Sequence, residues 1–416
     1  MPFQSEYSRN VVKVMTGTTL AQALPIAVAP ILTRLYAPDA FGIFYLYAAL
    51  TSILSVVATG RYELAILIPK NGREAFHTAM AGLWATLFFS LFLLIGVVPF
   101  RHSLANWLGE PGLAPWFFLL PVSVFVQGCY NVGNFWHNRH KRFGLLTRSK
   151  VLVSGTNAGS RVGLAWVFSG AGGLIWGTFS SWFMGLFQFV WMFLKKDRFH
   201  FKNYRRTEMI AQARRFRHFP GTMVVGSLFN KGNVELPPIL LNLFFSPAIA
   251  GFFGQMNAVL RQPLLVVGRA FEEVFKQKAS EEIHEFGHCK PVFRKTLIRL
   301  IVLGIGPFLI LFVIAPALFS FVFGDEWETA GLYARYFSLP LFLQFVASPL
   351  SALFALRERT QWYTMLELGQ LVFVVLALLL GALVLKDPNL TLLLLAGAYT
   401  IGLTCRLILL WRIGHG

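Results

Sequence analysis

Two cationic side chains stand inside apolar stretches of this sequence, where they could bind a charged ligand. Arg161 lies about ten residues into the apolar segment 151–168, which contains no acidic residue. Lys231 lies in the segment 223–244, four residues before Glu235. A charged side chain in hydrocarbon costs several kcal/mol unless it is paired or faces water. These positions therefore predict a water-accessible binding site within the apolar part of the chain.

The charges inside the apolar segments are mostly positive. Further cations in or at the ends of these segments include Arg34, Arg261 and Arg335. The acids within them are only Glu235 and Glu367. A basic interior favours an anionic ligand, because a site for cations needs carboxylates. Lys231 and Glu235 are one helical turn apart and can also neutralise each other, so that this pair remains open between binding and a structural role.

One motif resembles a zinc site. The run His284-Glu285-Phe286-Gly287-His288 matches H-E-x-x-H, in which two histidines on one helical face bind zinc beside a glutamate base. Gly287 and the nearby Pro291 disfavour the helix that such a site needs, and no third ligand is close in sequence. We expect a solvated helix end, with weak adventitious metal binding as the alternative. No metal or other cofactor is predicted.

The composition sets the class of protein. Of 416 residues, 56% are hydrophobic and 13% charged, whereas a soluble domain carries about 25% charge. An integral membrane protein is therefore predicted, and its spans are expected to be helices because each backbone amide must be paired inside the bilayer. Twelve segments qualify: 14–36, 41–57, 75–100, 113–135, 151–168, 174–194, 223–244, 248–268, 297–323, 332–356, 363–385 and 390–410.

The chain contains an internal repeat. The phrase LYAPDAFGIF, from residue 35, is echoed by FFSPAIAGFF, from residue 244, with Pro38 and Pro247 at an offset of 209 residues. Further on, Gly60-Arg61 is matched by Gly268-Arg269, at an offset of 208. Each copy is predicted to be the short turn between the first two helices of a six-helix half. Two parallel repeats then make two lobes, with the substrate site expected between them.

Basic residues predict the orientation. Of 37 lysines and arginines, 30 fall in segments on one side of the predicted membrane, which assigns that side and both termini to the cytoplasm. The basic and aromatic linker at 195–219 also accounts for part of the net charge of +18. Nucleic-acid binders share such a composition, but in this setting it favours contact with anionic lipid headgroups. Nucleic acid is not expected as a partner.

Several phrases together resemble a known family. They are ILTRLYAPDAFGIF, ATGRYELAILIPKN, NFWHNRHKRF, LPPILLNLFFSPAIAGFF, VFKQKASEE and FGDEWETAGLYARYF. As a set they resemble the polysaccharide-flippase branch of the multidrug/oligosaccharidyl-lipid/polysaccharide (MOP) exporter superfamily, the Wzx-type translocases of O-antigen or capsule repeat units. The resemblance implies a V-shaped bundle of two six-helix lobes, residues 1–200 and 201–416, with alternating access. It also implies a cargo of oligosaccharide on undecaprenyl pyrophosphate in the bacterial inner membrane.

Residue roles follow from this combined interpretation. Arg161 and Lys231, one from each lobe, are expected to hold the pyrophosphate, while Arg61 and Arg269 meet it at the inner mouth. Glu235 is the candidate for ion coupling, since burial and a nearby ammonium shift a carboxyl pKa in opposite directions. Further substrate contacts are assigned to Arg34, Arg261, Arg335, Asn131, Asn134, Asn230, Asn233 and Asn257. A polysaccharide polymerase and a chain-length regulator are candidate protein partners.

Two alternatives of other classes remain open. A MATE-like cation-coupled drug exporter would carry a buried aspartate in an early helix, whereas the only early aspartate here is Asp39 in the outer turn. A structural subunit of a polysaccharide assembly complex would need no charged cavity. The sequence contains no Walker loop, serine-elbow motif or pair of carboxylates in one outer loop, so that we do not expect an enzyme.

Overall fold

A computed structural model describes residues 2–415, with side chains at residues 17, 19 and 21–414. Residues 2–415 are almost entirely helical and contain no β-strand, which confirms the predicted all-α class. The helices are α1 (Pro2–Leu35), α2 (Pro38–Thr59), α3 (Tyr62–Ala65), α4 (Gly72–Val97), α5 (Arg101–Trp107), α6 (Leu120–Arg139), α7 (Phe143–Leu164), α8 (Gly172–Lys196), α9 (Arg206–Arg215), α10 (Val224–Phe244), α11 (Pro247–Phe286), α12 (Lys290–Phe323), α13 (Glu328–Leu350), α14 (Ala352–Leu356), α15 (Thr360–Leu380) and α16 (Pro388–His415). Short tight or wide helical turns are η1 (Pro111–Phe118), η2 (Arg198–Asn203), η3 (Phe219–Met223), η4 (Asp325–Trp327) and η5 (Gly381–Leu385).

The chain is a multi-pass membrane protein. Within the described residues, six helical segments are long and apolar enough to cross a bilayer, or seven if the bent pair η1 and α6 counts as one span. They are Pro38–Thr59, Gly72–Val97, Lys290–Phe323, Asp325–Leu356, Thr360–Leu385 and Pro388–Gly414. A helix also stands at each other predicted span. In α1 the apolar part Ala21–Leu35 is short, and α7 carries the charged residues Arg148, Lys150 and Arg161. The number of twelve crossings therefore stays a prediction.

The described chain divides into two compact units. Unit 1 contains the residues up to Val28 and Leu35–Lys231, and unit 2 contains Ala29–Arg34 and the residues from Gly232 on. The division falls inside α10, so that Lys231 belongs to unit 1 and Glu235 to unit 2. Each unit has its own buried core and is described separately below.

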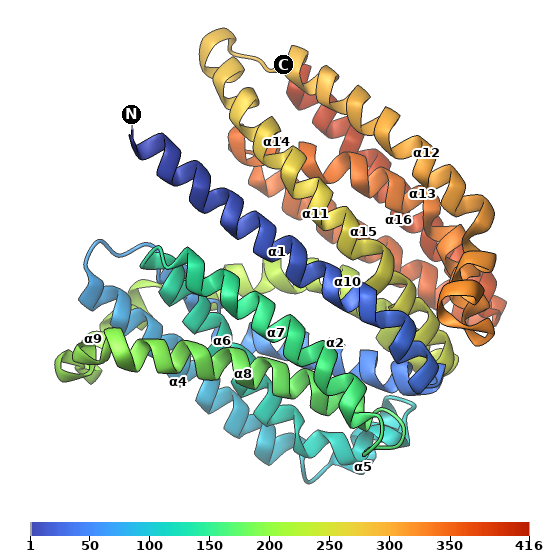
Figure 1. The fold of residues 1–416 in the computed structure, drawn as a ribbon, viewed down its shortest axis with the longest axis horizontal. Helices are drawn as coiled ribbons and strands as arrows, with labels where there is room; N and C mark the ends of the chain where they lie inside the picture. The colour runs from blue at the N-terminus through green and yellow to red at the C-terminus, as the bar shows by residue number, and fades with distance from the viewer. Residues whose placement is uncertain (1, 416) are drawn as a thin grey trace. The chain divides into compact units, whose positions relative to one another are not determined.

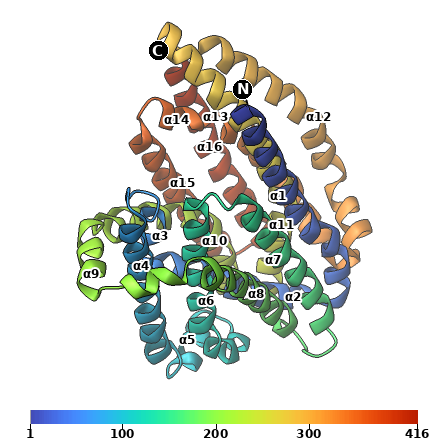
Figure 2. The same cartoon turned by 60° about the vertical axis from the view of Figure 1, so that its left-hand side comes forward.

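Helix α6 is the centre of unit 1. Helices α2, α4, α7 and α8 all pack against it, and Figure 2 shows α6 among these helices. A buried cluster of Phe76, Val132 and Trp136 joins α4 to α6. Close approach uses glycine, because a Cβ at Gly128 would lie 2.6 Å from the Thr86 methyl carbon of α4. The core therefore fixes the helices that carry the cationic residues of this unit.

Helix α13 is the centre of unit 2. It packs against α11, α12 and α16, and Figure 1 shows α12, α13 and α16 running alongside one another. Gly331 brings α13 close to a bend in α12, since a Cβ there would lie 2.6 Å from Pro316 Cα. Proline lacks an N–H, so Pro316 leaves the carbonyl of Phe312 without its helical donor. The packing of α13 supplies a replacement donor, described below.

The segment between predicted spans 248–268 and 297–323 is helical rather than a loop. Helix α11 continues to Phe286, and α12 already begins at Lys290. The predicted span 248–268 forms the first part of α11, and the helix continues beyond it because the following stretch is amphipathic. Its apolar face carries Phe275 and Ala279, which join Phe293 in the main core of unit 2, while charged residues stay exposed.

The H-E-x-x-H motif lies at the end of α11. Gly287 has φ 76°, a left-handed conformation, and its N–H bonds to the Ile283 carbonyl, so that the helix ends before His288 as expected from the glycine. His284 and His288 therefore do not share one continuous helical face. Among the described residues, no three His, Cys, Asp or Glu side chains are grouped as metal ligands.

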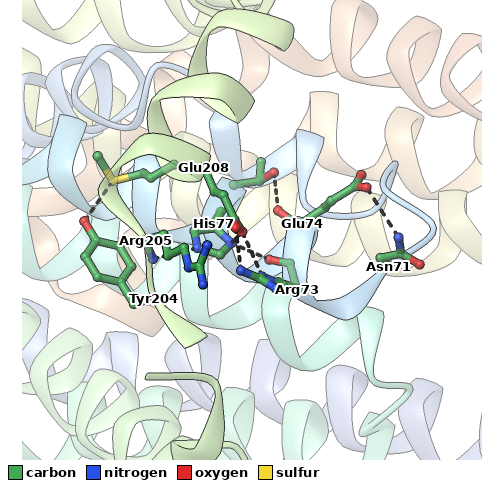
Figure 3. Close-up of polar contacts among 9 residues, drawn as sticks. Asn71, Arg73, Glu74, His77, Tyr204, Arg205 and Glu208 are labelled. Atoms are coloured by element: carbon green, nitrogen blue, oxygen red, sulfur yellow. Dashed lines mark hydrogen bonds and ion pairs between the residues drawn. The ribbon is translucent and has the colours of Figure 1, made fainter. Parts of the chain in front are cut away.

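The basic linker after α8 is folded onto α4. Figure 3 shows the ion pair between Arg73 of α4 and Glu208 of α9, with His77 beside it. The buried His77 accepts a hydrogen bond from the Arg205 backbone N–H at 3.0 Å, while its other ring nitrogen lies 2.8 Å from the Arg73 carbonyl. Arg215 at the end of α9 pairs with Glu74 at 2.9 Å. These polar contacts attach the linker to α4. Contact of the linker with lipid headgroups stays a prediction.

The repeated phrase forms the same local structure twice. In each copy a helix ends and a proline, Pro38 or Pro247, begins the next helix at its first turn. Proline suits this position because its fixed φ is helical and the first N–H groups of a helix have no helical acceptor. The predicted short turns between helices are confirmed, although each proline starts the second helix rather than breaking the first.

Candidate functional site

Arg161 lies where three helices of unit 1 meet. Its Nη2 donates a hydrogen bond of 2.7 Å to Thr178 Oγ1 of α8, and its Cζ is 4.4 Å from the centre of the Phe44 ring of α2. The Tyr36 hydroxyl donates to the Arg161 carbonyl at 2.7 Å. Gly177 allows α8 to come this close, because a Cβ there would lie 2.9 Å from the Arg161 backbone nitrogen.

No acidic group among the described side chains balances the charge of Arg161. Among the described side chains, no carboxylate lies within 4.0 Å of its guanidinium, and its buried Nε has no hydrogen-bond partner. Thr178 supplies one neutral acceptor, and the Phe44 ring supplies an electron-rich face. Neither carries a negative charge. An anion that reaches this guanidinium gains a charge-assisted hydrogen bond and an electrostatic partner.

Lys231 is the second predicted cation, and it also contacts α2. Its Nζ is 2.7 Å from Ser52 Oγ. Ser52 and Phe44 are eight residues apart on α2, which corresponds to about 12 Å along a helix axis. Helix α2 therefore positions both cations, a role that the sequence interpretation did not assign to it. Phe44 and Ser52, the α2 residues that contact the two cations, are of types that are common in apolar helices. The only sequence feature that could have indicated this role is the hydroxyl of Ser52 within an apolar segment.

Arg61 stands at a strained turn after α2. Gly60 and Arg61 have φ 56° and 59°, and a left-handed conformation is uncommon for a residue with a side chain. The turn directs Arg61 Nε to Ser227 Oγ at 2.8 Å and Nη1 to Glu63 at 3.2 Å. Glu63 is 1% exposed, and its second oxygen has no hydrogen-bond partner among the described residues. Glu63 therefore offsets part of the charge of Arg61.

The second copy of this pair has a different structure. Gly268 and Arg269 lie inside the continuous α11, where Gly268 is buried and Arg269 is exposed. The two copies therefore differ in local backbone structure, because Ala270 to Glu273 continue a helix whereas a tight turn follows Gly60. Their equivalent placement in the two halves stays a prediction. The contact of Arg61 and Arg269 with a substrate stays a prediction.

Arg335 has its donors engaged by backbone. Its Nε and Nη2 donate to the carbonyls of Phe312 and Val313 in α12, each at 3.0 Å. The Phe312 carbonyl is the one that Pro316 leaves without a helical donor. Arg335 therefore satisfies the bent backbone of α12, a role that was missed because it joins residues distant in sequence.

The other predicted residues are spread over both units. Arg34 is exposed in the last turn of α1, and Arg261 is partly buried on α11. Glu235 is partly buried one turn after Lys231 on α10. Among the asparagines, Asn134 on α6 and Asn257 on α11 are partly buried, Asn230 on α10 is exposed, and Asn131 is partly buried on α6.

Asn233 belongs instead to a polar network inside unit 2. Its side-chain nitrogen donates to Glu367 Oε2 at 3.0 Å and to the Glu367 carbonyl at 2.9 Å. Arg406 Nη2 pairs with the other carboxylate oxygen at 2.5 Å, and the Tyr399 hydroxyl donates to the Asn233 carbonyl. This network of α10, α15 and α16 was not predicted. The sequence feature that could have indicated it is the presence of Glu367 and Arg406 in two separate apolar helices.

Comparisons with known proteins agree with this fold. The family model described as polysaccharide biosynthesis protein matches residues 31–331. A search of curated proteins finds no match.

Solved structures of three transporters cover nearly the whole chain. An inward-facing multidrug resistance MATE family transporter of the MOP superfamily has 15% identity and a TM-score of 0.63, covering 97% of this chain and 94% of its own. The lipid II flippase MurJ in an inward closed conformation has 14% identity and a TM-score of 0.70, covering 97% and 86%. A MOP superfamily transporter from Pyrococcus furiosus has 17% identity and a TM-score of 0.61, covering 98% and 94%. The chain has the two-lobe helical fold of these transporters.

Proposed function

Because the chain belongs to the polysaccharide biosynthesis protein family, we propose that it carries oligosaccharide repeat units on undecaprenyl pyrophosphate from the cytoplasmic to the periplasmic leaflet of the bacterial inner membrane. The fold it shares with MOP-superfamily transporters supports transport by alternation between inward- and outward-facing states. MurJ, a lipid II flippase of the same fold, supports a lipid-linked cargo.

The observation that carries this proposal is the unbalanced charge of Arg161. The pyrophosphate of the carrier lipid is the anionic group that must leave the headgroup region during translocation. A guanidinium presents several N–H donors in a plane that matches phosphate oxygens. Arg161 has a buried Nε without a partner among the described residues and no neighbouring carboxylate. In this proposal the pyrophosphate takes the position of the missing counter-ion.

Lys231 is the second proposed ligand of the pyrophosphate. Its ammonium is held by a serine hydroxyl of α2, the helix that also contacts Arg161. Arg161 of α7 and Lys231 of α10 contact α2 at residues about 12 Å apart along its axis. In this proposal the phosphates pass from one cation to the other as α2 moves. Arg61, at the end of the same helix, is then the third cation in line and a point of first contact for the substrate.

The remaining assignments of the site stay part of the proposal. Asn134, Asn230 and Asn257 supply hydrogen bonds to sugars, and Arg269, Arg34 and Arg261 supply further positive charge. Both termini are assigned to the cytoplasm from the distribution of basic residues; residues 1 and 416 themselves lie outside the described range. A polysaccharide polymerase and a chain-length regulator are proposed as partners that receive or measure the product.

Replacing Arg161 tests the proposal. In the bacterium that carries this chain, with the variant as its only copy, Arg161→Ala is expected to reduce surface polysaccharide by about ten- to a hundredfold, because a hydrogen bond to a charged group contributes about 1.5–3 kcal/mol. Arg161→Lys should retain part of the transport, since it keeps the charge but loses the planar donors. Surface polysaccharide is measured beside a blot of the protein in the membrane.

The matched control is Arg148→Ala. Arg148 lies on the same helix α7, is exposed, and its replacement changes the net charge equally. Surface polysaccharide should be unchanged in this variant. Normal polysaccharide from Arg161→Ala at a normal protein level would contradict the proposal.

Glu235 is proposed to couple transport to an ion gradient. It is partly buried and lies one turn from Lys231 on α10. Glu235→Gln removes the carboxylate but keeps the size, and should abolish the dependence of transport on the proton gradient. Transport into membrane vesicles with an imposed pH difference measures this. An unchanged dependence in the variant would remove Glu235 from coupling.

A further inference from the structure

Unit 1 contains an apolar groove away from the residues that contact Arg161. It lies where α4 and α8 pack against α6, with a cavity volume of about 390 Å³. Its wall on α4 runs from Phe76 to Leu87, which corresponds to about 16 Å of helix. Trp84 of α4 and Val190 of α8 are exposed at its rim. The groove is therefore open at the surface that a bilayer covers.

The lining of the groove offers nothing polar to a ligand. It consists of aliphatic and aromatic side chains apart from Cys129 and His137 of α6. His137 is already engaged, with one ring nitrogen 3.2 Å from the Phe189 carbonyl and the other 3.0 Å from an Arg142 nitrogen. An apolar chain is the ligand that fits such a surface, since each buried methylene contributes about 0.8 kcal/mol.

The dimensions of the groove match one acyl chain. The α4 wall of about 16 Å is as long as an extended acyl chain of about thirteen methylene groups, because each group adds roughly 1.25 Å. A polyprenyl carrier chain is several times larger and would leave most of its length outside.

One end of the groove carries positive charge. Phe201, which follows α8, closes this end by packing edge-on against Phe76 and Phe193, with ring centres 5.6 and 5.3 Å apart. Four exposed basic residues surround this end of α8: Lys195, Lys196, Arg198 and Lys202. They follow the groove residue Leu194 directly in the sequence.

The single acid in this segment does not cancel that charge. Asp197 is buried and accepts hydrogen bonds from both terminal nitrogens of Arg142, at 2.6 and 2.7 Å, and from the indole of Trp136 at 2.9 Å. Burial acts to raise the pKa of Asp197, but the hydrogen bonds from Arg142 and Trp136 outweigh it, so that the pKa lies below its ordinary value. Asp197 therefore remains ionised and is neutralised internally, and the four cations are left for an external anion.

We propose that this groove binds one acyl chain of an anionic glycerophospholipid, with the lipid phosphate against Lys195 and Lys196. The proposal is independent of the transported substrate. A bound lipid contacts α4, α6, α8 and Phe201 at once, and so connects the bundle of unit 1 to the start of the linker. The chemistry that selects it is a negative headgroup beside a chain of about thirteen methylenes or more.

Native mass spectrometry of the purified full chain tests this, with phosphatidylglycerol and phosphatidylcholine of identical acyl chains as probes. The protein should retain one phosphatidylglycerol at concentrations where phosphatidylcholine is lost. Lys195→Gln with Lys196→Gln should weaken phosphatidylglycerol by about thirtyfold, because each basic residue near an anionic headgroup contributes about 1 kcal/mol. Phosphatidylcholine should be weakened much less, because its choline cation already offsets its phosphate. The charge-matched control is Lys276→Gln with Lys290→Gln, two exposed residues of unit 2.

Variants that fill the groove distinguish the contribution of the acyl chain to binding from that of the headgroup. Leu83→Trp on α4 should reduce retention of both lipids, and Val190→Trp at the exposed rim is a second variant for the case that the first does not fold. Equal retention of the two lipids by the unaltered protein would overturn the proposal. So would undiminished retention of phosphatidylglycerol in a folded groove-filled variant, or its displacement by undecaprenyl phosphate at a lower concentration than by phosphatidylglycerol itself.

Discussion

Each of the two units holds an arginine inside its helices, and the two arginines are stabilised in different ways. Both guanidinium groups lie near an aromatic ring, Arg161 at 4.4 Å from Phe44 and Arg406 at 5.2 Å from Tyr363. Arg406 also pairs with Glu367, and the two side chains are only 11% and 7% exposed. Arg161 has a threonine hydroxyl in the corresponding role.

The difference separates a structural charge from a functional one. The Arg406 and Glu367 charges cancel inside unit 2, and Asn233 fixes the carboxylate further, so that no net charge is left for a ligand. Around Arg161 one positive charge is left over among the described residues. An uncompensated cation is tolerated only where water or an anion can reach it. A buried arginine therefore indicates a binding site only when its hydrogen-bond partner carries no negative charge, as for Arg161, and not when it is paired with a carboxylate, as for Arg406.

The largest effect is expected from breaking the pair in unit 2. Glu367→Ala leaves Arg406 buried without its counter-ion, which costs about 3–5 kcal/mol. The melting temperature of the purified protein should fall by about 10 °C. Removal of Arg161 leaves no carboxylate behind, and Arg161→Met should change the melting temperature much less. Thermal unfolding of both variants in the same detergent measures the contrast.

A double substitution controls for packing at this position. Glu367→Leu with Arg406→Met removes both charges and should recover most of the stability, because apolar residues of similar size replace the pair. Equal destabilisation by Glu367→Ala and Arg161→Met would show that the two arginines are equally dependent on their protein surroundings. The distinction between a structural and a functional arginine would then fail.

Arg335 is a third case, because its hydrogen-bond partners are backbone carbonyls rather than a carboxylate or a hydroxyl. Arg335→Ala leaves the exposed Phe312 carbonyl without a donor in α12, and loss of an intramolecular hydrogen bond costs about 0.5–1.5 kcal/mol. In a Pro316→Ala background the restored N–H can bond to that carbonyl, so that Arg335→Ala should cost less. Melting temperatures of Arg335→Ala, Pro316→Ala and the double variant show whether the effects of the two substitutions on stability depend on each other. Additive effects would show that Arg335 does not compensate for the proline.

Much of the fold could be predicted from periodicity and local rules. Long apolar runs indicated the helices, and Pro38 and Pro247 indicated the two turns, because proline acts through its own ring. Arg161 was recognised for a similar reason, since a charge in an apolar helix is visible without knowledge of its neighbours. The family followed from a set of phrases and is shown by the match over residues 31–331.

What could not be predicted depends on contacts between distant residues. Glu367 and Arg406 are 39 residues apart on different helices, and Arg335 lies 23 residues after the carbonyl that it satisfies. Lys231 contacts Ser52 across 179 residues. The full length of α11 could not be predicted for another reason. An amphipathic helix with many charges has the composition of a loop, and only burial of one face identifies it.

The smallest effect tests the two copies of the Gly-Arg pair directly. Gly60 has φ 56°, so that Gly60→Ala places a side chain in a left-handed conformation at a cost of about 1–2 kcal/mol. Its Cβ would also lie 3.3 Å from Pro220 Cγ. Gly268 lies within α11, and a Cβ there meets its nearest atom, Ser348 Oγ, at 3.9 Å.

Alanine in a helix is favoured over glycine by about 0.5–1 kcal/mol. Gly268→Ala should therefore raise the melting temperature by a few degrees, while Gly60→Ala lowers it. Changes of the same sign in both variants would mean that the two pairs share one backbone conformation, and that the repeat extends through them after all.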